Sequence, residues 1–480
     1  MSTARMSRRD FLRAAVGASA GLLGLSALSA CQPAAPAAPA AGGAAPAAEG
    51  PVVINVWWWS NPVYEAAVQT FNSVNGKIKV NMSELGEAVF GDQKYLTAVA
   101  AGTGPDSALQ NRHTFMQFAA KKLYKSLDEY FNRDGYKKED FTPVQLAESS
   151  WDGVIYGIPW VTDTRHLFYN VNHLEEAGFA APPTTWAETE EYTVKLTKKK
   201  DNGEIEVLGF VPYALGNSWM WMYGFLNKAP AISEDKRTIL CDDPRWIYAL
   251  EWITSIYDKH MGVSFEQVSA FDQGFTTQTQ DLFIQQKVSM IITGDWMLNT
   301  YSRFPDLNWA MVPAPIPPEG EKSSWSCGWG FVIAPESKHP EEAWEWIKWI
   351  TGVEGWRAVA EGNLAETKKQ WEREQIPGDP IFVPSEACYL PAVEMLEKEF
   401  VSKLPEKLQK EYELGIDCLR NWTHGCGTEM GLAALTYWVE MDNAARNALS
   451  HKLSAAEAMK QCKDKVQKAT DEAWASLEKA

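Results

Sequence analysis

Basic side chains and histidine are scarce in this chain of 480 residues. Lys and Arg number 45 against 62 Asp and Glu, the formal net charge is −17 at pH 7, and there are 7 histidines. Nucleic acids and anionic membranes are bound through basic surfaces, so this acidic balance argues against both as partners. The isolated histidines also give no support to a Ser-His-Asp or Cys-His catalytic site.

Cysteine is scarce as well, and none of it follows a metal-binding or redox spacing. No Cys-x-x-Cys pattern occurs, and no histidine lies at ligand spacing beside a cysteine, so we expect no metal ion and no cofactor. Disulfides towards the carboxyl terminus and buried free thiols both remain open. The cysteines concerned are Cys241, Cys327, Cys388, Cys418, Cys426 and Cys462.

Long apolar runs are missing after the amino-terminal segment. No later stretch reaches the roughly 18 uninterrupted apolar residues that a membrane-spanning helix needs. The phosphate-binding loop G-x-x-x-x-G-K-[ST], the zinc motif H-E-x-x-H and the calcium-binding EF-hand loop are absent too. The sequence therefore shows no motif of a nucleotide-, zinc- or calcium-dependent protein.

The amino-terminal segment carries an export signal. The twin arginine Arg8 and Arg9 precedes a weakly apolar segment that ends in small residues and Cys31. Such a segment is removed after export, and small residues before a cysteine form a lipid-attachment site. We expect residues 1–31 to be a twin-arginine (Tat) lipoprotein signal peptide, with an acylated Cys31 as the anchor outside the cytoplasmic membrane. Residues 32–50 are nearly all Ala, Pro and Gly and predict an extended tether.

The folded sequence begins with alternating strands and helices. Residues 52–59 have the composition of a buried strand, and Asn61-Pro62 starts a helix. A strand at 77–82, a helix from about residue 92 and a strand at 105–109 follow. This order predicts a parallel α/β sheet, which binds ligands at the carboxyl ends of its strands. A folded length of roughly 430 residues predicts two lobes.

Further helix starts are marked by capping residues and prolines. Thr185 and Glu188 form a capping box, while Asp243-Pro244 and His339-Pro340 each begin a helix. A charged amphipathic helix is predicted from about residue 453.

Tryptophan, by contrast, is abundant, with 22 in the chain. A flat indole matches the apolar face of a pyranose ring, while neighbouring Asp, Asn and Gln bind its hydroxyl groups. Tryptophans at helical spacing are expected in the core: Trp344, Trp346 and Trp349. Those beside Gly, Asn, Ser or Asp at predicted element ends are expected to line a cleft: Trp59, Trp219, Trp296 and Trp329.

Four groups of residues occur in an order that resembles a known family. They are Ala98–Asp106; Tyr156–Pro159 with Leu167–Asn170, Glu176–Gly178 and Pro182–Trp186; Phe283 with Lys287, Met290 and Gly294–Trp296; and Gly328 with Lys338–Trp344. In this order they resemble the sugar-type (family 1) extracellular solute-binding proteins of ABC importers, which include the maltodextrin-binding proteins. The resemblance covers nearly all of residues 51–480.

The resemblance implies a two-lobed α/β fold of the periplasmic-binding-protein type. Three hinge crossings would let the lobes close on a ligand. The matching segments place these crossings near Pro159–Asp163, Val312–Pro315 and Asn363–Thr367. Lobe 1 is then residues 51–163 plus 312–365, and lobe 2 is residues 164–311 plus 366–480.

The resemblance also implies roles for individual residues. Asp163 matches a hydroxyl-binding carboxylate, Trp296 a stacking ring and Trp438 a second one. Where the maltodextrin-binding proteins carry a stacking Trp and an Asp, this chain has Gln110, Asn111 and His113, which argues against a maltodextrin specificity. The expected ligand-binding residues are Trp58, Trp59, Asn61, Gln110, Asn111, Trp160, Asp163, Asn217, Trp219, Trp221, Asp295, Trp296, Gly328, Trp329 and Trp438.

These features imply a binding protein and not an enzyme. We expect a monomeric extracytoplasmic lipoprotein, in the periplasm or at the cell surface, that captures a sugar or oligosaccharide and delivers it to the permease of an ABC importer. A polyol, a glycerophosphodiester or a peptide-like solute is an alternative ligand, although a phosphate needs more cations than Arg112 and Arg165. A secreted glycoside hydrolase, with Asp163 and Asp295 flanking the bond, is the remaining alternative.

Overall fold

The structure is a computed structural model, and it describes residues 50–84, 92–212, 220–272 and 281–479. Gly50–Ala480 forms one compact unit. The expected signal residues Arg8 and Arg9, the lipid-attachment residue Cys31 and the expected ligand-binding residues Asn217 and Trp219 lie outside the described ranges. Within those ranges, no helix combines the length and the apolar character that crossing a membrane requires.

The described strands form a seven-stranded sheet, a five-stranded sheet and a two-stranded one. In spatial order the first sheet contains β13 (Glu386–Ala387), β6 (Gly157–Asp163), β12 (Ser324–Ile333), β3 (Ser107–Asn111), β1 (Val52–Trp58) and β2 (Ile78–Glu84), with β14 (Thr423–Gly425) beside β12. Strands β2 and β3 pair with β1 in parallel, as the alternation of strands and helices predicts. Strand β12 runs antiparallel to β3 and β6, so the sheet is mixed.

The second sheet is built around β7 and β10. Its spatial order is β11 (Trp309–Val312), β7 (Arg165–Asn170), β10 (Val288–Gly294), β9 (Ile205–Val211) and β8 (Lys198–Lys199). Strand β7 is antiparallel to both neighbours, and β9 is parallel to β10. The small third sheet pairs β4 (Ser150–Trp151) with β5 (Val154–Ile155).

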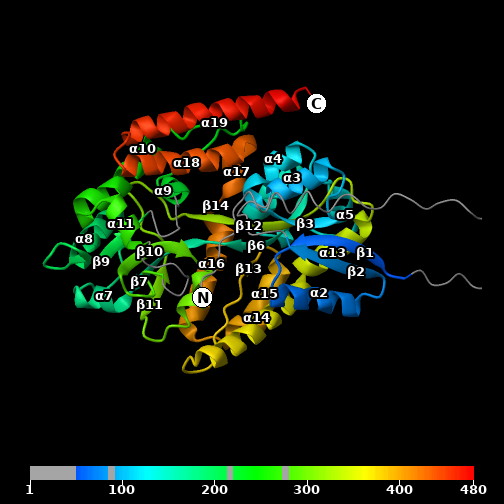
Figure 1. The fold of residues 1–480 in the computed structure, drawn as a ribbon, viewed down its shortest axis with the longest axis horizontal. Coiled ribbons are helices and arrows are strands. Elements are labelled where there is room, and N and C mark those ends of the chain that lie inside the picture. Colours follow the sequence, from blue (N-terminus) through cyan, green and yellow to red (C-terminus); the bar gives the residue numbers. More distant parts are fainter. Residues whose placement is uncertain (1–49, 85–91, 213–219, 273–280, 480) are drawn as a thin grey trace, which may run out of the picture. The chain divides into compact units, whose positions relative to one another are not determined.

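The helix starts predicted from capping residues are confirmed. The Asn61 side chain accepts hydrogen bonds from the first-turn amides of α2 (Pro62–Val74), and Thr185 and Glu188 form the capping box of α8 (Trp186–Leu196). Two proline starts are confirmed in α10 (Pro244–Ser255) and α13 (Pro340–Thr351), and the last predicted helix is α19 (Ala455–Leu477). Figure 1 shows α19 lying along α18 (Ala434–Leu449), which it contacts.

The other helices of the described residues connect these elements. The α-helices are α3 (Asp92–Ala100), α4 (Phe115–Ala120), α5 (Asp128–Arg133), α6 (Pro143–Glu148), α7 (Val171–Glu176), α9 (Met220–Leu226), α11 (Phe265–Asp272), α12 (Met297–Tyr301), α14 (Val353–Glu374), α15 (Leu390–Glu399), α16 (Glu406–Asn421) and α17 (Cys426–Met430). The remaining turns are η1 (Arg112–Thr114), η2 (Lys138–Asp140), the π-helical η3 (Ile256–Met261), η5 (Val401–Lys403) and η6 (Gly431–Ala433).

The chain passes between the two main sheets near the first two expected crossings. Strand β6 ends at Asp163 in the first sheet, and β7 begins at Arg165 in the second. The second passage leads from Val312, the end of β11, to β12. Residues 363–367 lie inside α14, and beyond this helix β13 and β14 both pair with strands of the first sheet. The lobe boundaries themselves stay a prediction.

Buried cysteines in the described part of the chain carry free thiols. They are Cys241, Cys327, Cys388, Cys418 and Cys462. Of the two alternatives left open by the sequence, these five residues therefore follow the buried-thiol one.

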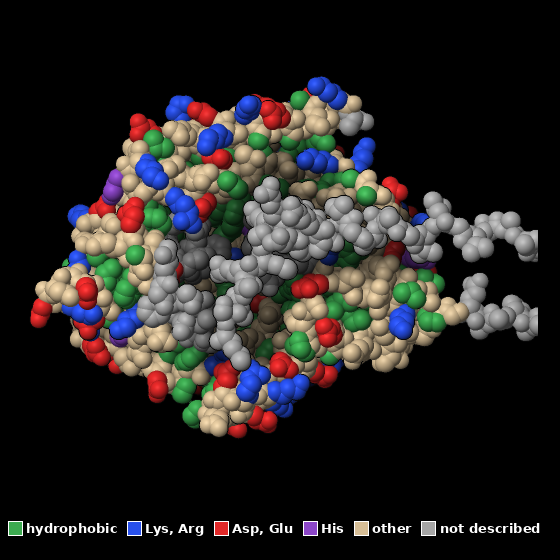
Figure 2. All heavy atoms as spheres, in the orientation of Figure 1, with side chains coloured by type: hydrophobic (Ala, Val, Ile, Leu, Met, Phe, Trp, Pro, Cys, Tyr) green, Lys and Arg blue, Asp and Glu red, His purple; other side chains and the backbone are tan. Residues whose placement is uncertain are grey.

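The face of the molecule in Figure 2 carries acidic and basic side chains side by side. Outside the grey atoms, no broad basic surface is visible on that face. This distribution agrees with the net charge of −17, which argued against nucleic acid as a partner.

Candidate ligand-binding site

A pocket with a volume of about 240 Å³ is lined by residues of the first sheet and by residues that follow β10 of the second sheet. We call it the cleft pocket. Trp59, Asp163 and Asp295 stand at or just after the carboxyl ends of β1, β6 and β10, where ligands of such sheets bind. Of the expected ligand-binding residues it brings together Trp59, Asp163, Asp295, Trp296, Gly328 and Trp329. The remaining lining residues were not predicted from the sequence: Tyr64, Val161, Thr162, Leu298, Asn299, Pro384, Ser385, Glu386 and Tyr412.

Aromatic rings form two walls of the cleft pocket. Trp59 and Trp329, both beside the first sheet, meet at 76° with their ring centroids 5.0 Å apart, so they make a corner. Trp296 follows the second sheet, and 37% of its surface is exposed. A Cβ at Gly294 would lie 1.8 Å from the Trp296 ring, so only glycine lets the indole fold back against β10. The ring is thereby held against β10 while more than a third of its surface stays exposed.

Gly328 sets the distance between β12 and β6 beneath the cleft pocket. Gly328 has a φ of 148°, and a Cβ there would lie 2.2 Å from the carbonyl oxygen of Val161 on β6. Only glycine permits this close approach of β12 to β6.

Asp163 is the carboxyl group at the end of β6. Its Oδ1 accepts hydrogen bonds from the Cys327 backbone N–H, at 2.9 Å, and from the Arg165 guanidinium, with which it forms an ion pair. Burial raises the pKa of Asp163 to about 7, against the opposing effect of Arg165. Arg165 itself is buried, donates to the carbonyl oxygen of Trp325 and lies over the Trp296 ring.

Asp295 and Glu386 form a pair of buried carboxyl groups that joins the two sheets. Asp295, after β10, accepts bonds from the backbone N–H and the hydroxyl of Thr164, at 2.7 and 2.6 Å. Glu386, on β13 of the first sheet, is hydrogen-bonded to Asp295. Burial raises the pKa of both groups, and the neighbouring Asp295 charge raises that of Glu386 further. Two carboxyl groups in this contact share a proton.

Two buried polar atoms at the cleft pocket have no partner among the described residues. They are Oε2 of Glu386 and Oη of Tyr412. A buried polar group without a partner costs free energy, so it commonly marks a place where a ligand or water binds.

A larger hollow of about 620 Å³ lies near the end of α19, lined by Lys121, Trp151, Trp474 and other residues that the sequence did not indicate.

A family model described as "Bacterial extracellular solute-binding protein" matches residues 66–367. The chain belongs to this family. The resemblance recognised in the sequence is therefore confirmed.

Individual relatives extend the comparison of this solute-binding protein. A protein of Brucella abortus (strain 2308) that is named only as a binding protein is 27% identical over 332 residues, which cover 65% of this chain and 74% of the relative. The structure of the sugar-binding protein MalE from the phytopathogen Xanthomonas citri has a TM-score of 0.69 and 19% identity, over 89% of this chain and all of that one (100%). CpMnBP1, solved with mannobiose bound, has a TM-score of 0.68 and 23% identity, over 86% of this chain and 99% of its own. These structures confirm the predicted two-lobed α/β fold class.

Other expected ligand-binding residues of this solute-binding protein lie in its core. Trp58, Trp160 and Trp221 are 0%, 2% and 1% exposed and do not line the cleft pocket. Trp58 packs edge-on against Trp160, with centroids 5.2 Å apart, and Trp221 packs against Trp246. These rings present no face to a solute in this structure. Asn61 serves as the cap of α2 and also lies outside the pocket.

Gln110 and Asn111 are the last residues of β3 and Trp438 lies in α18, and none of the three lines the cleft pocket. Gln110 accepts a bond from the Tyr124 hydroxyl, and Asn111 caps η1. Trp438 packs edge-on against His113, with centroids 4.6 Å apart. Their part in ligand binding stays a prediction.

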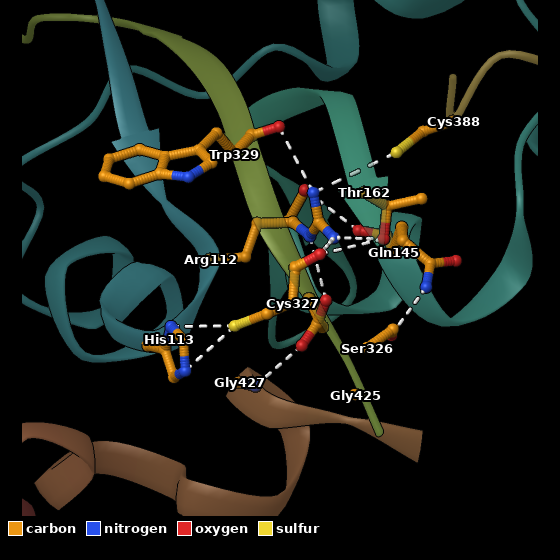
Figure 3. A network of polar contacts seen from close by, with 12 residues as sticks. Arg112, His113, Gln145, Thr162, Ser326, Cys327, Trp329, Cys388, Gly425 and Gly427 are labelled. Atoms are coloured by element: carbon orange, nitrogen blue, oxygen red, sulfur yellow. Dashed lines mark hydrogen bonds and ion pairs between the residues drawn. The ribbon is translucent and has the colours of Figure 1, made fainter. Parts of the chain in front are cut away.

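Arg112 lies beneath the cleft pocket in a buried network of polar contacts (Figure 3). Its guanidinium forms an ion pair with Glu148 at 2.9 Å and donates to the carbonyl oxygens of Val161 and Cys327, at 2.7 and 2.8 Å. Glu148 also accepts a 2.7 Å bond from the Gly427 N–H. The network joins β6 and β12 to the start of α17. Arg112 is therefore committed to the fold.

Glu386 is the most important lining residue that was not predicted from the sequence. The sequence gives one weak indication of a buried carboxyl group here, because Glu386 is the single charged residue in Val383–Cys388. Its strand has two residues and pairs with β6, so nothing nearby in the sequence indicates that Glu386 reaches Asp295.

Proposed function

We propose that this protein is the extracytoplasmic substrate-binding lipoprotein of an ABC importer and that it captures a sugar or oligosaccharide in the cleft pocket. The observation that carries the proposal is the joint lining of one pocket by aromatic rings and carboxyl groups from the first sheet and from the segment that follows β10 of the second sheet. Indole faces stack on sugar rings, and carboxylates accept hydrogen bonds from sugar hydroxyls. The mannobiose bound to CpMnBP1 and the sugar-binding character of MalE from Xanthomonas citri support the same class of ligand.

Capture depends on closure around the solute. Trp59 follows β1 and Trp329 lies on β12 of the first sheet, while Asp295 and Trp296 follow β10 of the second. A solute that touches both sets stabilises the closed arrangement, because those contacts do not exist when the sets are apart. Hydrogen bonds to charged groups contribute about 1.5 to 3 kcal/mol each, so a few of them with a stacked ring give micromolar affinity.

A phosphate-bearing solute is disfavoured. Among the described residues that line the cleft pocket there is no lysine, arginine or histidine. Arg112 is engaged with Glu148, and Arg165 with Asp163. A phosphate there would meet carboxyl groups without a counter-charge.

Binding without catalysis is part of the proposal. Asp295 is tied to Thr164 and Glu386, an arrangement that does not leave it free to act as a nucleophile or base on a glycosidic bond. The nearby thiol of Cys327 lies 3.0 and 2.9 Å from the two ring nitrogens of His113 (Figure 3). A sulfur equally close to both nitrogens lies along the lone pair of neither, so the two do not form a nucleophile–base pair.

The proposed location follows from the amino-terminal segment. Export directed by Arg8 and Arg9 and acylation of Cys31 would anchor the protein outside the cytoplasmic membrane. The tether of residues 32–50 would let a monomeric body reach the permease.

The test is a binding screen of the soluble protein, made unlipidated by Cys31→Ser. A ligand present at about 100 times its Kd adds roughly 2.7 kcal/mol of stability, which raises Tm by several degrees. We expect a response among mono- and oligosaccharides, with the sugar recovered intact after long incubation. A response confined to polyols, glycerophosphodiesters or peptides would contradict the proposed ligand, and a cleaved sugar would contradict the binding role.

A further inference from the structure

The charged side chains that line the cleft pocket are all acidic among the described residues. Among the described residues that line it are Asp163, Asp295 and Glu386, and no basic side chain. Arg165 compensates Asp163 through their ion pair. Asp295 and Glu386 form no ion pair among the described residues, although the Arg165 charge lowers the pKa of Asp295, and the hydrogen bond between the two carboxyl groups implies one shared proton. The pocket therefore carries an acidic pair whose natural partner is a cation.

The position of Glu386 is built into the fold. Its side chain is 4% exposed, and its Oε2 has no partner among the described residues. On the neighbouring helix α16, a Cβ at Gly415 would lie 1.9 Å from Glu386 Oε1, so a glycine makes room for the carboxyl group. Burying a carboxyl group with an unpaired oxygen is costly unless the site gains a ligand.

The aromatic lining suits the same kind of ligand. Trp59 and Trp329 meet as a corner, and Tyr412 and Tyr64 add two further rings around the pocket. The negative faces of aromatic rings attract ammonium groups, most strongly where water is excluded. Carboxyl groups with an aromatic corner thus form a setting for an organic cation.

We infer that the solute carries a protonated amino group, which binds between Asp295 and Glu386 against the aromatic rings. This inference rests on the proposed function, and under it the solute is an amino sugar. Among the described residues, no group of three or more His, Cys, Asp or Glu side chains is placed to hold a metal ion, so an ammonium group fits better than a metal.

Proton release accompanies this binding. The ammonium group takes the place of the shared proton, which leaves to solvent, so both carboxylates become charged beside one cation. The other titratable or charged groups facing the pair are Asp163 with Arg165, Tyr412, Cys388 and Cys418. Arg165 already has its partner, and the pKa of each of the last three is raised by burial, so they stay neutral.

The experiment compares sugars that differ in one substituent. Titration calorimetry of the full chain carrying Cys31→Ser is run with glucosamine, N-acetylglucosamine and glucose, with the corresponding galactose and mannose sets, and with chitobiose, diacetylchitobiose and cellobiose. We expect the amine to bind at least tenfold more tightly than the acetamide and the hydroxyl sugar of its set. Repeating the titration in buffers of different ionisation enthalpy should show proton release.

Variants link this preference to the carboxyl pair. Glu386→Gln keeps the shape of the side chain and should reduce the affinity for the amine at least tenfold, with a smaller effect on the neutral sugars. Glu411→Gln is the matched control, because Glu411 is a buried carboxyl group of α16 outside the cleft pocket. It should leave the amine preference unchanged.

The outcomes separate the inference from the proposed function. Equal or tighter binding of neutral sugars would overturn the inference and leave the sugar-binding function standing. Spermidine tests an amine without a sugar ring: if it binds and no sugar does, the ammonium site is supported and the proposed sugar is wrong. Binding of no probe contradicts both.

Discussion

Two adjacent tryptophans at the end of β1 take opposite roles. Successive side chains of a strand point to opposite faces, so one residue decides between core and pocket. Trp58 is fully buried, and it packs against Trp160 and Phe331. Trp59 turns to the cleft pocket and meets Trp329. The same residue type thus supports the fold at one position and is available to a solute at the next.

Trp296→Ala is expected to abolish ligand binding while the protein stays folded. The ring is 37% exposed and lines the cleft pocket, so its removal takes away a stacking face and little core packing. We expect the free energy of unfolding to fall by less than about 2 kcal/mol. Calorimetry and urea unfolding measure the two effects.

Trp58→Ala provides the contrast. Removing a fully buried indole leaves a cavity, so we expect a loss of about 3 to 5 kcal/mol in unfolding free energy.

The prediction for Trp296 is contradicted if Trp296→Ala binds the screened ligand with unchanged affinity, because Trp296 would then not belong to the site.

At the scale of elements, helix starts were predictable because their signals are local. Asn61, Thr185 and Ser454 each cap the helix that follows, within a few residues in the sequence. Strands β13 and β14 were not predicted, because they have two and three residues and their partners lie far away in the chain. Their pairing comes from packing of distant segments, which a local pattern does not contain.

Gly415→Ala tests the fit between α16 and β13. Alanine favours a helix by about 1 kcal/mol over glycine, but a Cβ here would collide with the Glu386 carboxyl group. We therefore expect a net destabilisation of about 1 to 3 kcal/mol, with ligand affinity reduced at least tenfold. Glu413→Ala, at an exposed position of α16, is the control and should change neither. Stabilisation by Gly415→Ala would show that Glu386 has room to move.

Glu148→Ala tests the ion pair that joins η1, α6 and α17. The substitution leaves the Arg112 guanidinium buried without its carboxylate, which we expect to cost about 3 to 5 kcal/mol. The double variant Arg112→Met with Glu148→Leu should recover part of this loss, because no unpaired charge remains. Urea unfolding measures both, with Glu139→Ala at an exposed position as the control. Equal losses in the single and double variants would contradict a penalty from the unpaired charge.

For the molecule as a whole, the location of the cleft pocket was predictable and its acidic pair was not. Asp163, Asp295 and Trp296 follow strand ends, where such sheets bind ligands. Glu386 and Tyr412 reach the pocket from the carboxyl-terminal third of the chain. Only the tertiary structure reveals that these distant residues meet.

The stability of the whole protein should depend on pH through buried carboxyl groups. Burial raises the pKa of Glu411 and of Asp163 to about 7. A carboxyl group with a raised pKa in the folded state contributes stability that is present below about pH 4 and is lost as the pH rises to about 7. We therefore expect Glu411→Gln to be more stable relative to the natural protein at pH 7.5 than at pH 4.5.

The expected change for Glu411→Gln between those pH values is on the order of 2 to 3 kcal/mol. Urea unfolding at both pH values measures it. Glu413→Gln, whose side chain is exposed on the same helix, should show no such change. A pH-independent difference for Glu411→Gln would show that Glu411 titrates as in the unfolded chain.

The bond from Gly427 to Glu148 spans 279 residues of sequence. The first sheet starts with β1 and is completed only when β13 and β14 have paired with β6 and β12. During synthesis, the Gly427 bond to Glu148 therefore forms only after the last quarter of the chain has begun to leave the ribosome. Contacts this far apart in sequence make folding slow. A chain truncated before β14 would leave Ser324–Ser326 of β12 without their partner strand, so completion of this sheet depends on the carboxyl-terminal part of the chain.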